Sequence, residues 1–129
     1  MSHQCNDLVL TCIDYRLRPL QRSLLDEIGE CDRIAFAGAS KAIVDIDTRA
    51  SVLKQIDLSH TLHGMTTFYL VDHEDCGAYS SSATVLSEDE EFQVHASVSR
   101  SACEIIRQHF PHIRTISKYV KLNGEIVDI

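Results

Sequence analysis

Two segments far apart in the chain carry side chains that bind metal ions. In VDHEDCGAY, residues 71–79, His73 stands three positions before Cys76, and Cys12 ends the apolar run that opens LTCIDYRL. Two thiolates and one imidazole would make a Cys₂His set, which suits zinc and leaves a fourth position for water or substrate. An H-x-x-C pair alone is weak evidence, because a turn histidine beside a buried cysteine has the same pattern. The metal interpretation therefore depends on whether Cys12 meets the other two.

Asp14 and Arg16 follow Cys12 at two and four positions, in C-I-D-Y-R. A carboxylate this close could ligate zinc, accept a hydrogen bond from zinc-bound hydroxide, or pair with the arginine. Alternatively, the segment is a helix start with an acidic residue in its first turn and an exposed arginine.

The composition is that of an ordinary globular chain of 129 residues, and we expect one domain over residues 1–129. A formal charge of −7 argues against nucleic acid or an anionic membrane as partner. There is neither a signal-peptide pattern nor a run of about 20 apolar residues, so we expect a cytoplasmic protein. Five cysteines, an odd number, favour metal binding, catalysis or burial over a disulfide framework.

Strand and helix patterns alternate along the chain. Apolar runs predict strands at residues 7–13, 33–38, 66–71 and 113–122, and Asn123-Gly124 predicts a type I′ hairpin into a last strand at 125–129. Periodic apolar residues predict helices at 17–28 and 48–62, and a third that starts at a Ser87/Glu90 capping box and stops before Pro111. A loop is expected at residues 80–83.

This alternation predicts an α/β fold, with a mainly parallel sheet flanked by helices on both faces and a C-terminal antiparallel hairpin strand. In such sheets, ligands gather at the carboxyl ends of strands. Cys12 and the His73/Cys76 pair both follow predicted strand ends. They would therefore meet if the first and third strands are neighbours.

Taken together, C-x-D-x-R at one strand end and H-x-x-C-G at another resemble the β-class carbonic anhydrases, most closely their compact, single-domain branch. The resemblance extends over nearly the whole chain, through CIDYRL, IAFAGA, DHEDCGAY and the terminal hairpin.

The resemblance implies that Cys12, His73 and Cys76 bind Zn²⁺, with hydroxide in the fourth position. Asp14 and Arg16 match the family's catalytic dyad. In this dyad the aspartate orients the hydroxide, and the arginine keeps the aspartate carboxylate off the metal. The implied activity is reversible hydration of CO₂ to bicarbonate. The implied assembly is a homodimer or a higher homo-oligomer with active sites at the subunit boundary.

The sequence also departs from the family pattern. Only 11 residues precede Cys12, and the glutamine that many members supply from that region has no obvious counterpart. Asp72 replaces a glycine, and Tyr15 replaces a small residue. Asp72, Glu74 and Asp75 would disfavour a bound anion if they face the pocket; otherwise they are solvated turn residues.

Three other functions use the same residues. The same hydroxide could attack CS₂ or COS, as in some relatives of the family. A non-catalytic member would store or sense zinc, and a cysteine could act as nucleophile. Arg16 argues against storage, because a storage site has little need for a residue that restrains Asp14.

The remaining cysteines and histidines have simpler interpretations. Cys5, Cys31 and Cys103 are not expected to be ligands, and Cys103 suits a buried helix position. His60 and His63 stand near a helix end, where a surface role is favoured over proton shuttling. Tyr79 either lines the zinc pocket or packs against it.

The two thiolates lead to an expected pH dependence. They neutralise Zn²⁺, so bound water is less acidic than in a three-histidine site, where its pKa is about 7. We expect CO₂ hydration by the zinc-loaded protein to speed up between about pH 6 and pH 9. A rate that stays flat over this range would contradict the use of bound hydroxide.

Overall fold

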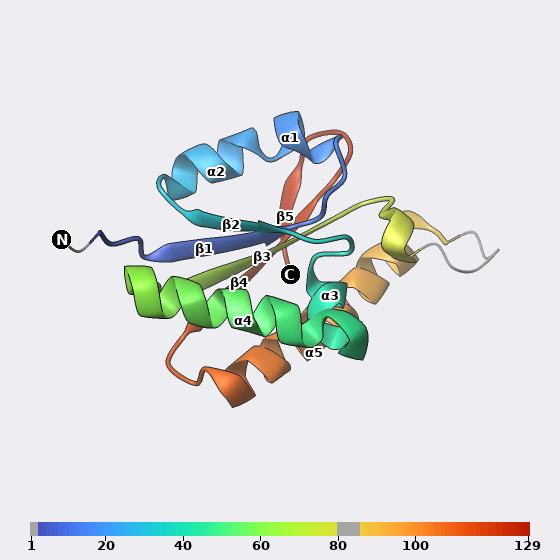
Figure 1. Cartoon of the computed structure of the whole chain (residues 1–129). Coiled ribbons are helices and arrows are strands. Elements are labelled where there is room, and N and C mark those ends of the chain that lie inside the picture. Colours follow the sequence, from blue (N-terminus) through green and yellow to red (C-terminus); the bar gives the residue numbers. More distant parts are fainter. Residues whose placement is uncertain (1–2, 80–85) are drawn as a thin grey trace.

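A five-stranded sheet forms the centre of the computed structural model, which describes residues 3–79 and 86–129 (Figure 1). The strand order is β2-β1-β3-β4-β5; the first four strands run parallel, and β5 pairs antiparallel with β4. The strands are β1 (Asp7–Thr11), β2 (Asp32–Ala35), β3 (Thr67–His73), β4 (Arg114–Val120) and β5 (Ile126–Asp128). The predicted α/β class and mainly parallel sheet are confirmed.

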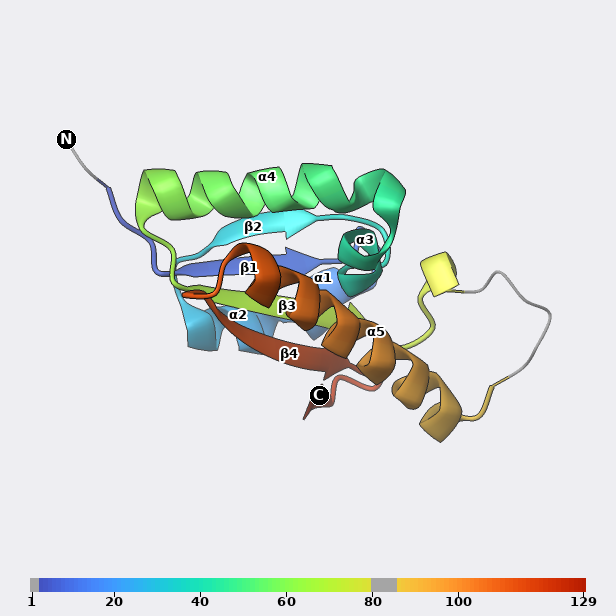
Figure 2. The ribbon, with the colours of Figure 1, turned by 90° about the horizontal axis from the view of Figure 1, so that it is seen from below.

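Helices cover both faces of the sheet, as Figures 1 and 2 show. One face carries α1 (Leu17–Leu20) and α2 (Arg22–Ile28); the other carries α3 (Ser40–Val44), α4 (Ile46–His63) and α5 (Glu88–His109). A short 3₁₀ helix, η1 (Gly77–Tyr79), follows β3.

Alternation along the strands produces two cores. Val9 and Val71 pack with Leu17 and Leu24 on one side of the sheet. On the opposite side the buried core is larger and includes Leu8, Leu10, Phe68, Leu70, Val52, Ile56 and Ile106. Since each strand residue points away from its neighbours, the near-continuous apolar runs of β1 and β3 are buried on both faces.

The register between β1 and β3 positions the candidate ligands. Thr11 pairs with Val71, so Cys12 leaves β1 beside the last residues of β3, and His73 is the final residue of that strand. The predicted adjacency of the first and third strands is confirmed. The segments that follow β1 and β3 leave the sheet at the same edge, where their side chains can meet.

Two elements differ from the prediction by more than a shift of one or two residues at their ends. The helix predicted at 17–28 is interrupted at Gln21, which ends α1 and begins α2. The strand predicted at 33–38 ends at Ala35, because the chain turns at Gly38 (φ +84°), and the short helix α3 follows where none was predicted. The loop predicted at residues 80–83 lies outside the described residues.

The C-terminal hairpin is confirmed, but its predicted turn type is wrong. A type I′ turn needs positive φ at both central residues. Among the described non-glycine residues only Ala39 and Asp75 have positive φ, so Asn123 does not meet this condition. Gly124 (φ +94°) instead closes a wider turn in which its N–H donates to the Lys121 carbonyl at 3.0 Å.

No helix in the described part of the chain has the length and apolar character needed to cross a membrane.

The start of α5 offers a test of local stability. The Glu90 N–H donates to Ser87 Oγ at 3.2 Å, and the Ser87 N–H donates to Glu90 Oε1 at 3.1 Å, so the predicted capping box is present. Ser87→Ala should lower the free energy of unfolding by about 1 kcal/mol, because it leaves helix-end donors unpaired. Urea denaturation measures this. Ser101→Ala, at an exposed position within α5, is the control; equal losses in both variants would contradict the role of the cap.

Candidate metal centre

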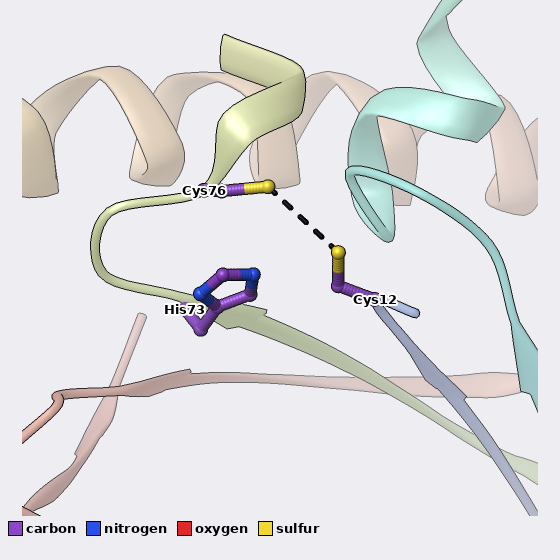
Figure 3. A group of neighbouring side chains, drawn as sticks. All are labelled: Cys12, His73 and Cys76. Atoms are coloured by element: carbon purple, nitrogen blue, oxygen red, sulfur yellow. Dashed lines mark hydrogen bonds between the residues drawn. The ribbon is translucent and has the colours of Figure 1, made fainter. Parts of the chain in front are cut away.

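Cys12, His73 and Cys76 converge at the carboxyl edge of the sheet. One ligand atom from each lies within 4.8 Å of the others, and the two sulfurs are 3.9 Å apart. All three residues are buried. Figure 3 shows the sulfurs facing each other with the His73 ring beside them. The structure thus brings together, from two strand ends 61 positions apart, the three side chains singled out in the sequence.

His73 is oriented by its main chain. Its Nδ1 lies 2.7 Å from the Glu74 carbonyl oxygen, which can only accept, so Nδ1 carries the proton and Nε2 presents a lone pair. Nε2 is buried and has no hydrogen-bond partner in the described part of the chain. An unpaired acceptor in the interior is costly, whereas a cation would satisfy it.

The two thiols also fit a divalent cation. Burial, with a smaller contribution from the neighbouring Cys12, raises the pKa of Cys76 to about 11, so both thiolates together need a nearby positive charge. The Gly38 N–H points at Cys12 Sγ from 3.4 Å and would favour its thiolate. With imidazole as third donor, this set matches zinc better than a hard cation that prefers oxygen.

Asp14 and Arg16 form a two-point ion pair beside the cluster. Arg16 Nε donates to Asp14 Oδ1 at 3.0 Å, and Nη2 donates to Oδ2 at 2.6 Å. These hydrogen bonds lower the pKa of Asp14 to about 2. Oδ2 lies 3.8 Å from His73 Nε2. An ionised carboxylate therefore sits next to the position to which the three ligand atoms point.

Arg16 has a second acidic partner that sequence reasoning did not assign to it. Its Nη1 donates to Asp75 Oδ2 at 3.1 Å, and Nη2 donates to the Asp75 carbonyl at 2.9 Å. Asp75 has φ +57°, and its N–H donates to Glu91 of α5. In the sequence, the acidic residues of HEDC (73–76) were the only indication of a partner for Arg16. The fold shows that this partner is Asp75.

Asp72 is not a solvated turn residue, which corrects one of the two expectations for it. It is 1% exposed, and its Oδ1 accepts from the Ser40 N–H at 3.0 Å. Burial raises its pKa to about 7. Glu74, by contrast, accepts from the Leu122 N–H at the surface. Asp72 replaces the glycine of the family pattern and ties β3 to the loop that carries Gly38.

A cleft of about 440 Å³ opens beside Cys12 and Asp14, between α1 and the ends of β1 and β2. Arg18 and Arg33 line it, as does Gln21, whose Oε1 is buried and has no hydrogen-bond partner among residues 3–79 and 86–129. Gln21 is a glutamine at the cleft that sequence reasoning missed, because it follows Cys12 rather than preceding it.

The other residues considered earlier lie outside the three-ligand cluster. Cys5 contacts main-chain carbonyls, and Cys103 contacts Ser117. His60 and His63 are at the last turn of α4, near the opposite edge of the sheet.

His95 of α5 is a buried residue that the sequence did not single out. It is 1% exposed, and its ring centroid lies 4.0 Å from that of Tyr79 and 5.2 Å from that of Tyr119. Neither ring nitrogen has a hydrogen-bond partner in the described structure. Burial, with a smaller contribution from His73, lowers the pKa of His95 to about 4. Tyr79 accordingly packs against this ring.

Comparison with protein families gives one match that covers the chain. A family model described as "Putative carbonic anhydrase" matches residues 2–129. Two curated relatives, described as uncharacterized proteins, come from Rickettsia bellii and Rickettsia conorii. Each is 24% identical over 98% of this chain, covering 83% and 73% of the respective relative.

Solved structures share the fold. The carbonic anhydrase from Streptococcus mutans superposes with a TM-score of 0.73 at 17% identity, over 99% of this chain and 83% of the other. A β-carbonic anhydrase from Trichomonas vaginalis gives 0.67 at 15% identity, over 99% and 84%. At these identities the likeness establishes the architecture, including the mostly parallel sheet.

The buried His95 ring makes stability depend on pH. An unfolded histidine titrates near pH 6.5, whereas His95 in the folded chain titrates near pH 4. Between these values the unfolded state binds one proton more than the folded state. The free energy of unfolding therefore decreases as the pH is lowered from about 6.5 to about 4, by up to about 3 kcal/mol. His95→Leu, which removes no hydrogen bond, should reduce this loss when urea unfolding is compared at about pH 7 and pH 4.5. The exposed His109→Leu is the control; an unchanged loss in the His95 variant would contradict the assignment.

Proposed function

The chain belongs to the carbonic anhydrase family whose model matches residues 2–129, and on this premise we propose that it catalyses the zinc-dependent, reversible hydration of CO₂ to bicarbonate. The observation that carries the proposal is the convergence of three buried ligand atoms within 4.8 Å, beside an ionised carboxylate. Cys12, His73 and Cys76 would hold the zinc ion. When bound, zinc supplies Lewis acidity, which lowers the pKa of water so that it can act as a nucleophile near neutral pH.

The protein's own groups prepare the ligands. The Glu74 carbonyl keeps the His73 proton on Nδ1, so Nε2 is available at every pH where the ring is neutral. The Gly38 N–H stabilises negative charge on Cys12 Sγ. These contacts come from the main chain, and they need no side-chain movement when a ligand enters.

Asp14 is proposed to orient the reacting water. Its pKa of about 2 keeps it a carboxylate above about pH 4, so it accepts a hydrogen bond and does not donate one. A water that donates to Asp14 Oδ2 has its oxygen lone pairs turned away from the carboxylate, toward CO₂. The proton released by hydration then passes to solvent or buffer, because Asp14 is too weak a base to retain it.

Arg16 is proposed to hold Asp14 at the edge of the metal site. It occupies both carboxylate oxygens and is itself restrained by the side chain and the carbonyl of Asp75. A carboxylate engaged at both oxygens is less free to become a zinc ligand. A storage or sensing site would gain nothing from this restraint, which favours the catalytic proposal over the non-catalytic one.

The cleft beside Cys12 is proposed as the route for substrate and product. Arg18 and Arg33 form no ion pair in the described structure, and they place positive charge on its walls. In a chain with a net charge of −7, this local charge would help to hold bicarbonate.

We also propose that the working unit is a homodimer or a higher homo-oligomer in the cytoplasm. Ile13 and Tyr15, which flank Asp14, are 66% and 86% exposed, and a second copy would cover them. One of the solved relatives, from Sordaria macrospora, is described as tetrameric. Light scattering at micromolar concentration should show at least a dimer, and a monomer would refute the proposal.

Asp14→Asn tests the assigned role. The uncharged amide should slow CO₂ hydration by about a hundredfold, because it can donate to the water that Asp14 orients, while zinc content stays at one per chain. Stopped-flow hydration and metal analysis measure the two quantities. Asp89→Asn, at an exposed position on α5, should change neither.

Two outcomes separate the alternatives. Rapid hydration by Asp14→Asn would refute the role of Asp14. One zinc per chain without CO₂ hydration would refute the activity and leave the metal site, and an assay with CS₂ or COS would then identify the related hydrolase.

A further inference from the structure

A pair of histidines lies at the edge of the sheet opposite Cys12, His73 and Cys76. His60 is on the last turn of α4, and His112 is in the turn between α5 and β4. Figure 2 shows the end of α4 and this turn at the amino ends of the strands. The two residues are 52 positions apart in sequence, yet their Nε2 atoms are 3.2 Å apart. Neither residue takes part in the proposed CO₂ chemistry.

The His60 ring has a defined orientation. Its Nδ1 lies 2.7 Å from the carbonyl oxygen of Met65, a fully buried residue. A carbonyl only accepts, so Nδ1 carries the proton of the neutral ring and Nε2 presents its lone pair toward His112. This is the arrangement in which metal-binding histidines occur, with one nitrogen donating to a carbonyl and the other facing the ion.

The spacing of the two nitrogens fits a shared metal ion. Two imidazole nitrogens at about 2.05 Å from a tetrahedral zinc ion are about 3.3 Å apart. The Nε2 atoms here are 3.2 Å apart. The ring centroids are only 4.6 Å apart and the rings are tilted by 54°, so the rings lie side by side. Rings that shared a straight hydrogen bond would lie head to head, with their centroids farther apart than this.

We propose that His60 and His112 form a second metal site, which takes Zn²⁺ or Ni²⁺ through two imidazole nitrogens, with water completing the coordination. Imidazole ligands select such borderline transition ions over Mg²⁺ and Ca²⁺, which prefer oxygen. No third His, Cys, Asp or Glu of residues 3–79 and 86–129 joins the pair in a three-ligand group. The site is therefore weaker than the three-ligand cluster.

Binding would link two elements that are otherwise distant in sequence. The ion would join the last turn of α4 to the turn between α5 and β4, both of which lie on the same face of the sheet. A ligand that binds only the folded chain stabilises it. Zinc above the level that fills the first site should accordingly raise the melting temperature.

The experiment measures zinc bound to the untagged, full-length chain by equilibrium dialysis at about pH 7.5, at increasing free zinc. We expect one zinc per chain at low free zinc and two at high free zinc. His60→Ala and His112→Ala should each weaken the second binding step by about tenfold or more and remove the added rise in melting temperature. His112 is exposed in a turn, so its substitution leaves the fold intact.

His109→Ala is the matched control, because His109 is exposed on the same part of the chain and its Nδ1 contacts the Ile105 carbonyl, with no second histidine facing it in the described structure. It should leave both binding steps unchanged. Paramagnetic Ni²⁺, added to the zinc-loaded chain, should broaden the imidazole resonances of His60 and His112 first.

Retention of the second zinc in His112→Ala, or its loss in His109→Ala, would overturn the proposal. The proposal would also be overturned if zinc binding saturated at one ion per chain and that ion were lost when Cys12 or Cys76 was substituted. A chain that binds one zinc through the histidines and none through the cysteines would support this site and refute the proposed function, so the two can fail separately.

Discussion

The parallel pairing of β1 with β3 is the constraint on which the candidate site depends. Because Thr11 is opposite Val71, Cys12 leaves the sheet beside His73. Parallel strands end at the same edge only if a long connection returns the chain to its starting side, and α4 provides this return. The apolar residues that hold β1 and β3 in register therefore also determine the distance between the ligands. A slip by one residue would turn Cys12 away from the cluster.

Main-chain strain beside the cluster is coupled to two of its contacts. Ala39 is fully buried with φ +47° and ψ −105°, a conformation that costs of order 1–3 kcal/mol for a residue with a side chain. On either side of it, the Gly38 N–H points at Cys12 Sγ and the Ser40 N–H donates to Asp72. The strained residue thus directs the N–H groups on either side of it toward Cys12 and Asp72, at two strand ends. Asp72, in place of the family's glycine, gives this loop a partner that glycine could not.

The two edges of the sheet carry different side-chain contacts. At the carboxyl edge Arg16 links Asp14, which follows β1, to Asp75, which follows β3. The pair with Asp14 is partly buried, and the pair with Asp75 is largely exposed, so the first contributes more to position and the second acts as a weaker restraint. At the amino edge, histidines meet each other or a carboxylate, as in the pairs His60–His112 and His63–Asp32. The two edges therefore offer different ligands to a metal ion: two thiols with one imidazole at the carboxyl edge, and a pair of facing imidazoles at the amino edge.

The sequence by itself determined the features that depend on neighbouring residues: the alternation of strands and helices, the Ser87/Glu90 cap, the short spacings around Cys12 and His73, and the resemblance that these motifs carry. From these, most of the fold and the composition of the candidate site could be predicted. Only the tertiary structure decided that Asp75 holds Arg16, that Asp72 is buried against Ser40, that Gln21 lines the cleft, and that His60 meets His112. It also showed that the turn at Asn123-Gly124 is not the type I′ turn expected from the sequence. The physical reason is that contacts between remote residues depend on strand order, register and side-chain direction, which the packing of the whole chain determines and no local pattern specifies.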